Sequence, residues 1–129
     1  MATARKMCMR GPAKMVMHSL QRDEAEDACK RLTKEFPSVQ FIPEWGDIFV
    51  HESLKDMPRR DLLANRETRR QFMEDVYERP TAERLGGFYL HALITKYRPD
   101  VIVDSVNSAT GLAYQDIYSA YYDMKRDLK

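Results

Sequence analysis

The side chains that most often carry chemistry are present in this chain, but they lack the spacing of the common reactive sites. His18, His51 and His91 lie far apart, without a carboxylate or cysteine at metal-ligand spacing. Cys8 and Cys29 form no C-x-x-C pair, and no serine lies in a G-x-S-x-G motif. The sequence therefore predicts no metal site and no serine nucleophile of the hydrolase type.

The composition of the chain limits the class of protein that it can be and the kinds of partner that it is expected to bind. The chain has 129 residues, the length of one domain, and its 21 basic and 20 acidic residues leave a formal charge of +1. So balanced a charge favours neither nucleic acid nor an anionic membrane as a partner. Residues 1–17 contain four basic side chains and no long apolar run, which indicates neither a signal peptide nor a membrane span. Two isolated cysteines then predict a reducing, cytoplasmic location.

Hydrophobic patterning predicts three strands. Residues 14–20 form a short apolar run, and residues 39–42 are β-branched and aromatic, closed by Pro43. The third strand, residues 99–104, contains a continuous Val/Ile run, which is typical of a parallel strand covered on both faces. Residues 1–13 are expected to be irregular.

The segments between the predicted strands show helical periodicity. An apolar face at three- and four-residue steps predicts a helix after residue 21 that ends near Pro37. Further helices are expected over residues 66–78, 81–97 and 112–127. The pair Gly86-Gly87 inside the helix expected over residues 81–97 indicates either close packing or a break. Strands that alternate with helices predict an α/β fold with parallel strands and right-handed helical crossovers.

Three segments at the ends of the predicted strands together resemble the short-chain dehydrogenase/reductase superfamily, in particular its extended branch that acts on nucleotide sugars. They are the polar turn with Arg22, the segment Phe41-Ile-Pro-Glu-Trp-Gly-Asp47-Ile48, and the segment Asp100-Val-Ile-Val-Asp-Ser-Val-Asn107-Ser-Ala109. They correspond to that family's second, third and fourth strands. The resemblance implies an incomplete Rossmann-like layered fold over residues 14–129, with a short parallel sheet of about three strands.

The resemblance also implies a cofactor, NAD or NADP, bound beyond the carboxyl ends of the strands. Arg22 would meet the adenosine ribose or a 2′-phosphate, Asp47 and Ile48 would flank the adenine, and Asn107 and Ala109 would lie near the nicotinamide ribose. The residues also allow simpler roles. Arg22 can be a solvated first residue of a helix, Asp47 can cap a helix that begins at Ile48, and Asn107 can close a turn.

The chain departs from the family pattern before residue 14. The family's first strand and glycine-rich turn would stand there, but residues 1–13 contain a single glycine, and the pyrophosphate then lacks its main binding site. We therefore expect a partial or degenerate NAD(P)-binding domain without full catalytic activity on its own. If it is active, the resemblance implies an oxidoreductase or a sugar-nucleotide epimerase.

The missing strand would leave the edge of the sheet open. Residues 5–9, direct pairing of the two exposed strands, or a second copy of the chain could close it. Unpaired edges favour association, so a homo-oligomer is expected. The alternative function is a non-enzymatic α/β interaction or oligomerisation domain, because a scaffold can persist without its site.

The family's catalytic pair is Tyr-x-x-x-Lys on a helix, where the lysine lowers the pKa of the phenol. Tyr121 and Lys125 have this spacing, and Ser108 lies thirteen residues earlier, as in the family. In the family, however, this pair follows a later strand, whereas Ser108 belongs to the turn after residues 99–104. We therefore do not accept the match, and the catalytic residues stay unassigned.

Overall fold

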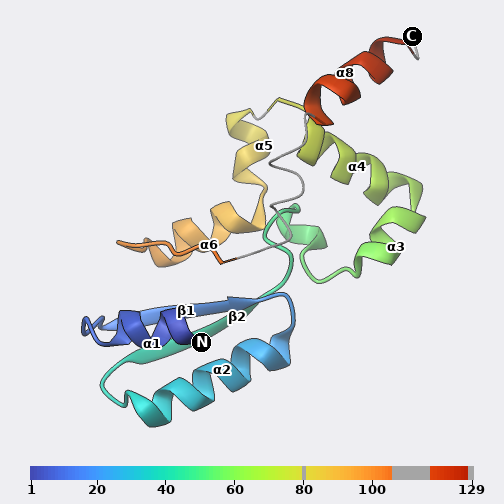
Figure 1. Cartoon of the computed structure of the whole chain (residues 1–129). Helices are drawn as coiled ribbons and strands as arrows, with labels where there is room; N and C mark the ends of the chain where they lie inside the picture. The colour runs from blue at the N-terminus through green and yellow to red at the C-terminus, as the bar shows by residue number, and fades with distance from the viewer. Residues whose placement is uncertain (80, 106–116, 128–129) are drawn as a thin grey trace.

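The computed structural model describes residues 1–79, 81–105 and 117–127, which form a mixed α/β arrangement around two parallel strands (Figure 1). In chain order the elements are α1 (Ala2–Cys8), β1 (Lys14–Ser19), α2 (Arg22–Glu35), β2 (Gln40–Trp45), the 3-10 helix η1 (Glu52–Leu54), α3 (Arg59–Ala64), α4 (Arg66–Tyr77), α5 (Ala82–Gly86), α6 (Tyr89–Tyr97) and α8 (Ile117–Asp127).

The first two strands form the parallel pair that the sequence predicts. β1 and β2 are hydrogen-bonded in a register that runs from Lys14 beside Gln40 to Ser19 beside Trp45, and α2 is the crossover between them. β2 continues beyond Pro43, which was expected to close it. Proline has no N–H to donate, but an edge strand tolerates it because one side of that strand needs no partner.

Two helices cover the faces of this sheet. α2 lies on one face and α6 on the opposite face (Figure 1). α2 buries Ala25, Cys29 and Leu32, which recur at steps of three and four residues, so the predicted apolar stripe faces the strands. Its acidic first turn, with Asp23 and Glu24, complements the helix dipole.

A second group of buried residues lies outside the sheet. η1, α3 and α4 enclose a cluster at the side where β2 ends (Figure 1), and its members are Val50, Leu54, Leu62 and Phe72. Across the described part of the chain, no helix combines the length and the apolar character that a bilayer span needs.

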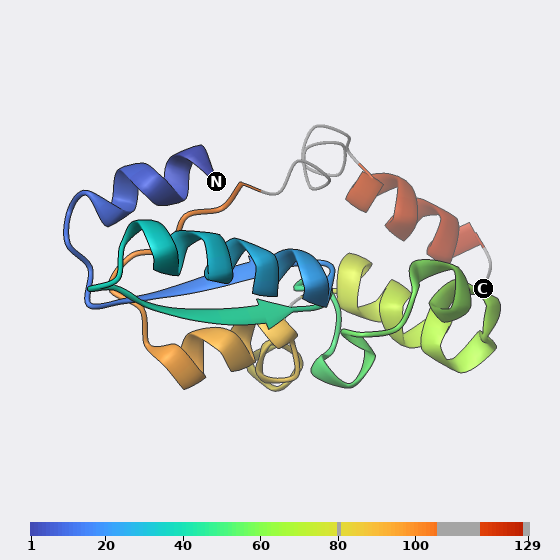
Figure 2. The same ribbon diagram turned by 90° about the horizontal axis from the view of Figure 1, so that it is seen from below.

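The predicted third strand does not form. Residues 101–105 have no regular structure, and the side chains of Val101, Ile102 and Val103 are 62%, 59% and 51% exposed. The segment after α6 runs along the β1 side of the sheet, opposite β2, but pairs with neither strand (Figure 2). High β-propensity is not enough here, because a strand exists only when a neighbouring strand accepts its hydrogen bonds.

The N-terminal residues are not irregular as expected. Ala2–Cys8 is the helix α1, because its alanines, lysine, arginine and methionine are good helix formers. Arg5 makes two hydrogen bonds of 2.7 Å to the carboxylate of Glu35, which attach α1 to α2, and Cys8 is buried. Residues 5–8 are therefore helical and do not close the edge of the sheet.

The helix predicted over residues 81–97 is broken into α5 and α6. The break is at Gly87, where a Cβ atom would lie 2.6 Å from the ring of His51. Phe88 then adopts an extended backbone as the N-cap residue of α6. The glycine pair thus marks both a break and a close contact.

Candidate functional site

The carboxyl ends of the parallel strands meet at one edge of the sheet, which we call the rim: Ser19, Arg22, Trp45, Asp47 and Ile48. Ser19 and Trp45 are neighbours in the register of β1 and β2. Arg22, the first residue of α2, places its guanidinium carbon 4.6 Å from the centroid of the Trp45 ring. This geometry is a cation–π contact, so Arg22 lies over the aromatic surface of Trp45.

The turn after β2 folds back because of a glycine. Gly46 has φ = +124°, a region that other residues rarely adopt, and its N–H donates to the carbonyl of Ser19 at 3.1 Å. A Cβ atom at Gly46 would lie 3.0 Å from the carbonyl oxygen of Lys55. The Nζ of Lys55 in turn lies 5.6 Å from the centroid of the Trp45 ring, so two cations face this indole.

Asp47 has a structural role at the rim. Its Oδ1 accepts the N–H of Phe49 at 2.9 Å, and its Oδ2 accepts the guanidinium of Arg59 at 2.6 Å. No helix begins at Ile48, so Asp47 closes a turn and caps no helix. The side chain of Asp47 is 15% exposed, and Ile48 is half-buried.

Glu44 forms a polar cluster beneath α6 that the sequence analysis missed. Its carboxylate accepts hydrogen bonds from Tyr89 at 2.9 Å, from Lys96 at 2.7 Å and from Tyr97 at 2.5 Å. Burial alone raises the pKa of Glu44, but these three donors outweigh burial and hold its pKa below the ordinary value. The sequence features that could have indicated this cluster are an acidic residue, Glu44, within an apolar strand and two tyrosines, Tyr89 and Tyr97, eight residues apart on one helix.

His18 lies beside Glu44 in the strand register and has an unusual environment. Its ring centroid is 6.0 Å from that of Tyr89, and its Nε2 is buried without a hydrogen-bond partner among the residues that the structure describes. Burial lowers the pKa of His18, because the imidazolium form would lose its hydration. The histidine is therefore a neutral, packed side chain in the sheet.

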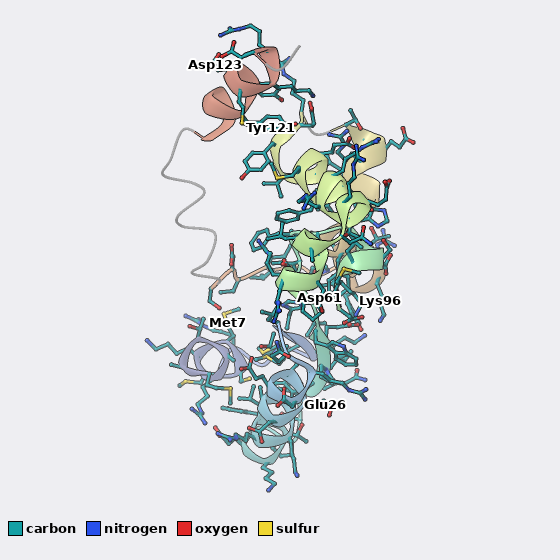
Figure 3. All side chains as sticks on the ribbon, turned by 90° about the vertical axis from the view of Figure 1, so that its right-hand side faces the viewer. Met7, Glu26, Asp61, Lys96, Tyr121 and Asp123 are labelled. Carbon is teal, nitrogen blue, oxygen red and sulfur yellow. The ribbon has the colours of Figure 1, made fainter. Side chains whose placement is uncertain are left out.

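Tyr121 and Lys125 come together, but far from the rim. Both side chains bond to the same oxygen of Glu78, Tyr121 at 3.1 Å, and the ring of Tyr121 stacks on Tyr77 at 5.0 Å between centroids. Figure 3 places Tyr121 at the end of the molecule opposite Glu26 of α2. The carboxylate of Glu78 forms an ion pair with the ammonium group of Lys125. Tyr121 and Lys125 therefore hold α8 against the end of α4.

Three predicted site residues, Asn107, Ser108 and Ala109, lie outside the described residues. The rim that can be described therefore contains Arg22, Asp47 and Ile48 from the predicted set, with Trp45 added. Within the described ranges, no three His, Cys, Asp or Glu side chains are arranged to hold a metal ion.

Comparison with known protein families, with curated proteins and with solved structures finds no match to this chain. The functional conclusion therefore depends on the rim and the sheet edge themselves.

Proposed function

We propose that the rim binds the adenosine half of NAD or NADP, as a partial or degenerate Rossmann-like relative of the short-chain dehydrogenases and epimerases. The observation that carries this proposal is the position of Trp45, at the carboxyl end of a parallel strand, with Arg22 over its ring and Asp47 two residues further on. Open α/β sheets bind nucleotides beyond this end of their strands.

Each rim residue has a distinct part in the proposed complex. The indole of Trp45 offers a flat surface on which adenine stacks when Arg22 moves aside, and the released guanidinium then binds a ribose hydroxyl or a 2′-phosphate. Asp47 already accepts two hydrogen bonds, but a carboxylate has about four lone-pair sites and can also accept the adenine amino group. Ile48 supplies an apolar wall.

The proposed binding is weak, because nothing described at the rim replaces the glycine-rich turn. The residues between β1 and α2 are Leu20 and Gln21, and neither is a glycine of the kind that lets a pyrophosphate approach the backbone closely. We assign no catalytic step to the chain. Tyr121 and Lys125 are engaged with Glu78 and have no part in the proposed site.

The test is a titration with NADH and with NADPH that follows the fluorescence of Trp45, the single tryptophan. We expect saturable quenching, and we expect Asp47→Asn to weaken binding of both cofactors about tenfold, because it removes a charged acceptor. Arg22→Gln should weaken NADPH more than NADH. Asp27→Asn, on the exposed part of α2, and Tyr121→Phe are the matched controls that should leave binding unchanged.

A flat titration with folded protein, or equal binding by the Asp47→Asn variant, would contradict the proposal. Because Asp47 also bonds to Arg59, the folded state of each variant is checked by its thermal transition. Arg59→Gln separates the two roles, since it removes the ion pair and leaves the carboxylate free for adenine.

A second candidate function is a non-enzymatic oligomerisation domain. The observation that favours it is the exposed run Val101-Ile102-Val103, because monomeric proteins rarely leave consecutive β-branched residues in water. Measurement of molar mass across a concentration series tests it. A monomer at every concentration would contradict this function.

A further inference from the structure

Arg59 connects the rim to the helical part of the chain. It is the first residue of α3, and its guanidinium donates to Oδ2 of Asp47 at 2.6 Å. The same guanidinium lies 4.8 Å from the centroid of the Phe72 ring, which is a cation–π contact. Phe72 belongs to the buried cluster that η1, α3 and α4 enclose. One side chain therefore contacts both the rim and the core of the helical part.

The carboxylate of Asp47 is largely covered by its own partners. Oδ1 accepts the N–H of Phe49, Oδ2 accepts Arg59, and 15% of the side chain is exposed. The backbone is held as well, because the N–H of Asp47 donates to the carbonyl of Lys55 at 2.8 Å. A ligand donor must therefore share this carboxylate with a cation that neutralises its charge, which weakens a charge-assisted hydrogen bond.

Arg59 can leave Asp47 at little cost. Its side chain is 51% exposed, and ion pairs that are so open to water contribute little to stability. A guanidinium that leaves Asp47 keeps the ring of Phe72 and gains water, so the released charge is not buried. The arrangement with Arg59 on Asp47 and the arrangement with Asp47 released therefore differ by a small free energy, and a ligand that prefers one of them can shift the balance.

We propose that the ion pair between Arg59 and Asp47 is an autoinhibitory contact, which lowers the affinity of the rim for adenine and is released when adenine takes the carboxylate. The inference rests on the proposed function, because both concern the same carboxylate. The contact acts in both directions by thermodynamic linkage. The factor by which the ion pair weakens ligand binding is the factor by which a bound ligand weakens the attachment of α3 to the rim.

The first test compares two neighbouring arginines of α3 whose removal should have opposite effects. Arg59→Gln removes the ion pair, so we expect it to raise the affinity for NADH about threefold, measured by the fluorescence of Trp45. Arg60→Gln is the matched control, because it removes an exposed cation at the next position. Loss of a cation by itself disfavours an anionic cofactor, so Arg60→Gln should leave the affinity unchanged or lower it.

Adenosine, which carries no phosphate, separates the local contact from the overall effect of charge. Arg59→Gln should raise the affinity for adenosine by the same factor as for NADH, and adding Asp47→Asn to this variant should remove the gain. Binding by Arg59→Gln that equals or falls below that of the wild type overturns the inference and leaves the proposed function in place. Absence of binding by both chains, with both folded, overturns the proposed function and the inference together.

The second test requires no ligand. Urea unfolding of the wild type, Asp47→Asn, Arg59→Gln and the double variant forms a double-mutant cycle. We expect the double variant to lose less stability than the sum of the two single losses, because either substitution alone already removes the ion pair. Additive losses would show that Asp47 and Arg59 are not coupled, and would overturn the inference whatever the rim binds.

The third test measures the effect of the ligand on α3. Saturating NADH should speed the hydrogen exchange of the α3 amides in the wild type, because it displaces Arg59 from the rim. The Arg59→Gln variant is the control, and its α3 amides should exchange at a rate that NADH does not increase. A bound ligand usually slows exchange, so unchanged or slower exchange in α3 of the wild type at saturation overturns the displacement of Arg59.

Discussion

Glu44 and Trp45, two adjacent residues of β2, point to opposite faces of the sheet. Side chains alternate along a strand, so Glu44 contacts α6 while Trp45 contacts Arg22 of α2. One strand end thereby holds a helix in place through its acid and forms an aromatic surface at the rim through its indole. The two roles can be separated by substitutions at single positions.

Gly86 and Gly87 are adjacent residues with different surroundings, which makes them a matched pair. A Cβ at Gly87 meets the His51 ring at 2.6 Å, whereas a Cβ at Gly86 would have no atom of the described residues within 4 Å. We expect Gly87→Ala to lower the free energy of unfolding by about 1–3 kcal/mol, as overpacking does. Gly86→Ala should leave it unchanged or raise it by about 0.5 kcal/mol. Urea denaturation measures both, and equal effects would contradict the contact.

At the scale of elements, one carboxylate joins β2 to α6. Glu44→Gln removes the charge that three donors share, so we expect the free energy of unfolding to fall by about 2 kcal/mol. Glu26→Gln is the control, because Glu26 makes an exposed pair with Arg22 one helical turn away, and such pairs contribute little. A loss of equal size in both variants would show that the cluster does not hold α6.

The same cluster predicts a pH dependence. The pKa of Glu44 is below its ordinary value of 4.5 in the folded protein, so its contribution to stability is present above that pH. It is lost as the pH falls through the lower, folded-state pKa, where the carboxylate becomes protonated. The difference in unfolding free energy between the wild type and Glu44→Gln should therefore be constant near neutrality and disappear in acid. A difference that grows in acid would refute the assignment.

His18 adds to the acid sensitivity of the sheet. Burial lowers its pKa in the folded state, so the unfolded chain binds the proton more readily. Stability from the neutral imidazole is present above the ordinary histidine pKa of about 6.5 and is lost as the pH falls below it. In a pH series of thermal unfolding, His18→Phe should lose less stability between pH 7 and pH 5 than the wild type does.

At the scale of the whole molecule, the described chain combines a two-stranded α/β part with a helical part that has its own buried cluster. In the run Val101-Ile102-Val103, all three residues are more than half exposed. The second candidate function predicts that the amides of residues 101–103 exchange quickly with deuterium in dilute solution and become protected as the concentration rises through the dimer dissociation constant. Hydrogen exchange followed by mass spectrometry measures this, and protection that does not depend on concentration would contradict the oligomerisation function.

The part of the fold that sequence alone determined is the unit β1–α2–β2, because its signals are local. Apolar runs of strand length and a helical stripe at Ala25, Cys29 and Leu32 specify each element within a few residues of chain. The position of Arg22 and Asp47 at one rim follows, since parallel strands end at the same edge.

Only the tertiary structure determined the contacts between residues that are distant in the chain. Glu44 and Tyr97 are 53 residues apart, and no local period links them. The run Val101-Ile102-Val103 has the composition of a strand, yet it remains unpaired because strand formation requires an acceptor edge in the right place. Local propensity selects a conformation for a segment, and only the arrangement of the other segments supplies the hydrogen bonds and cover that keep it.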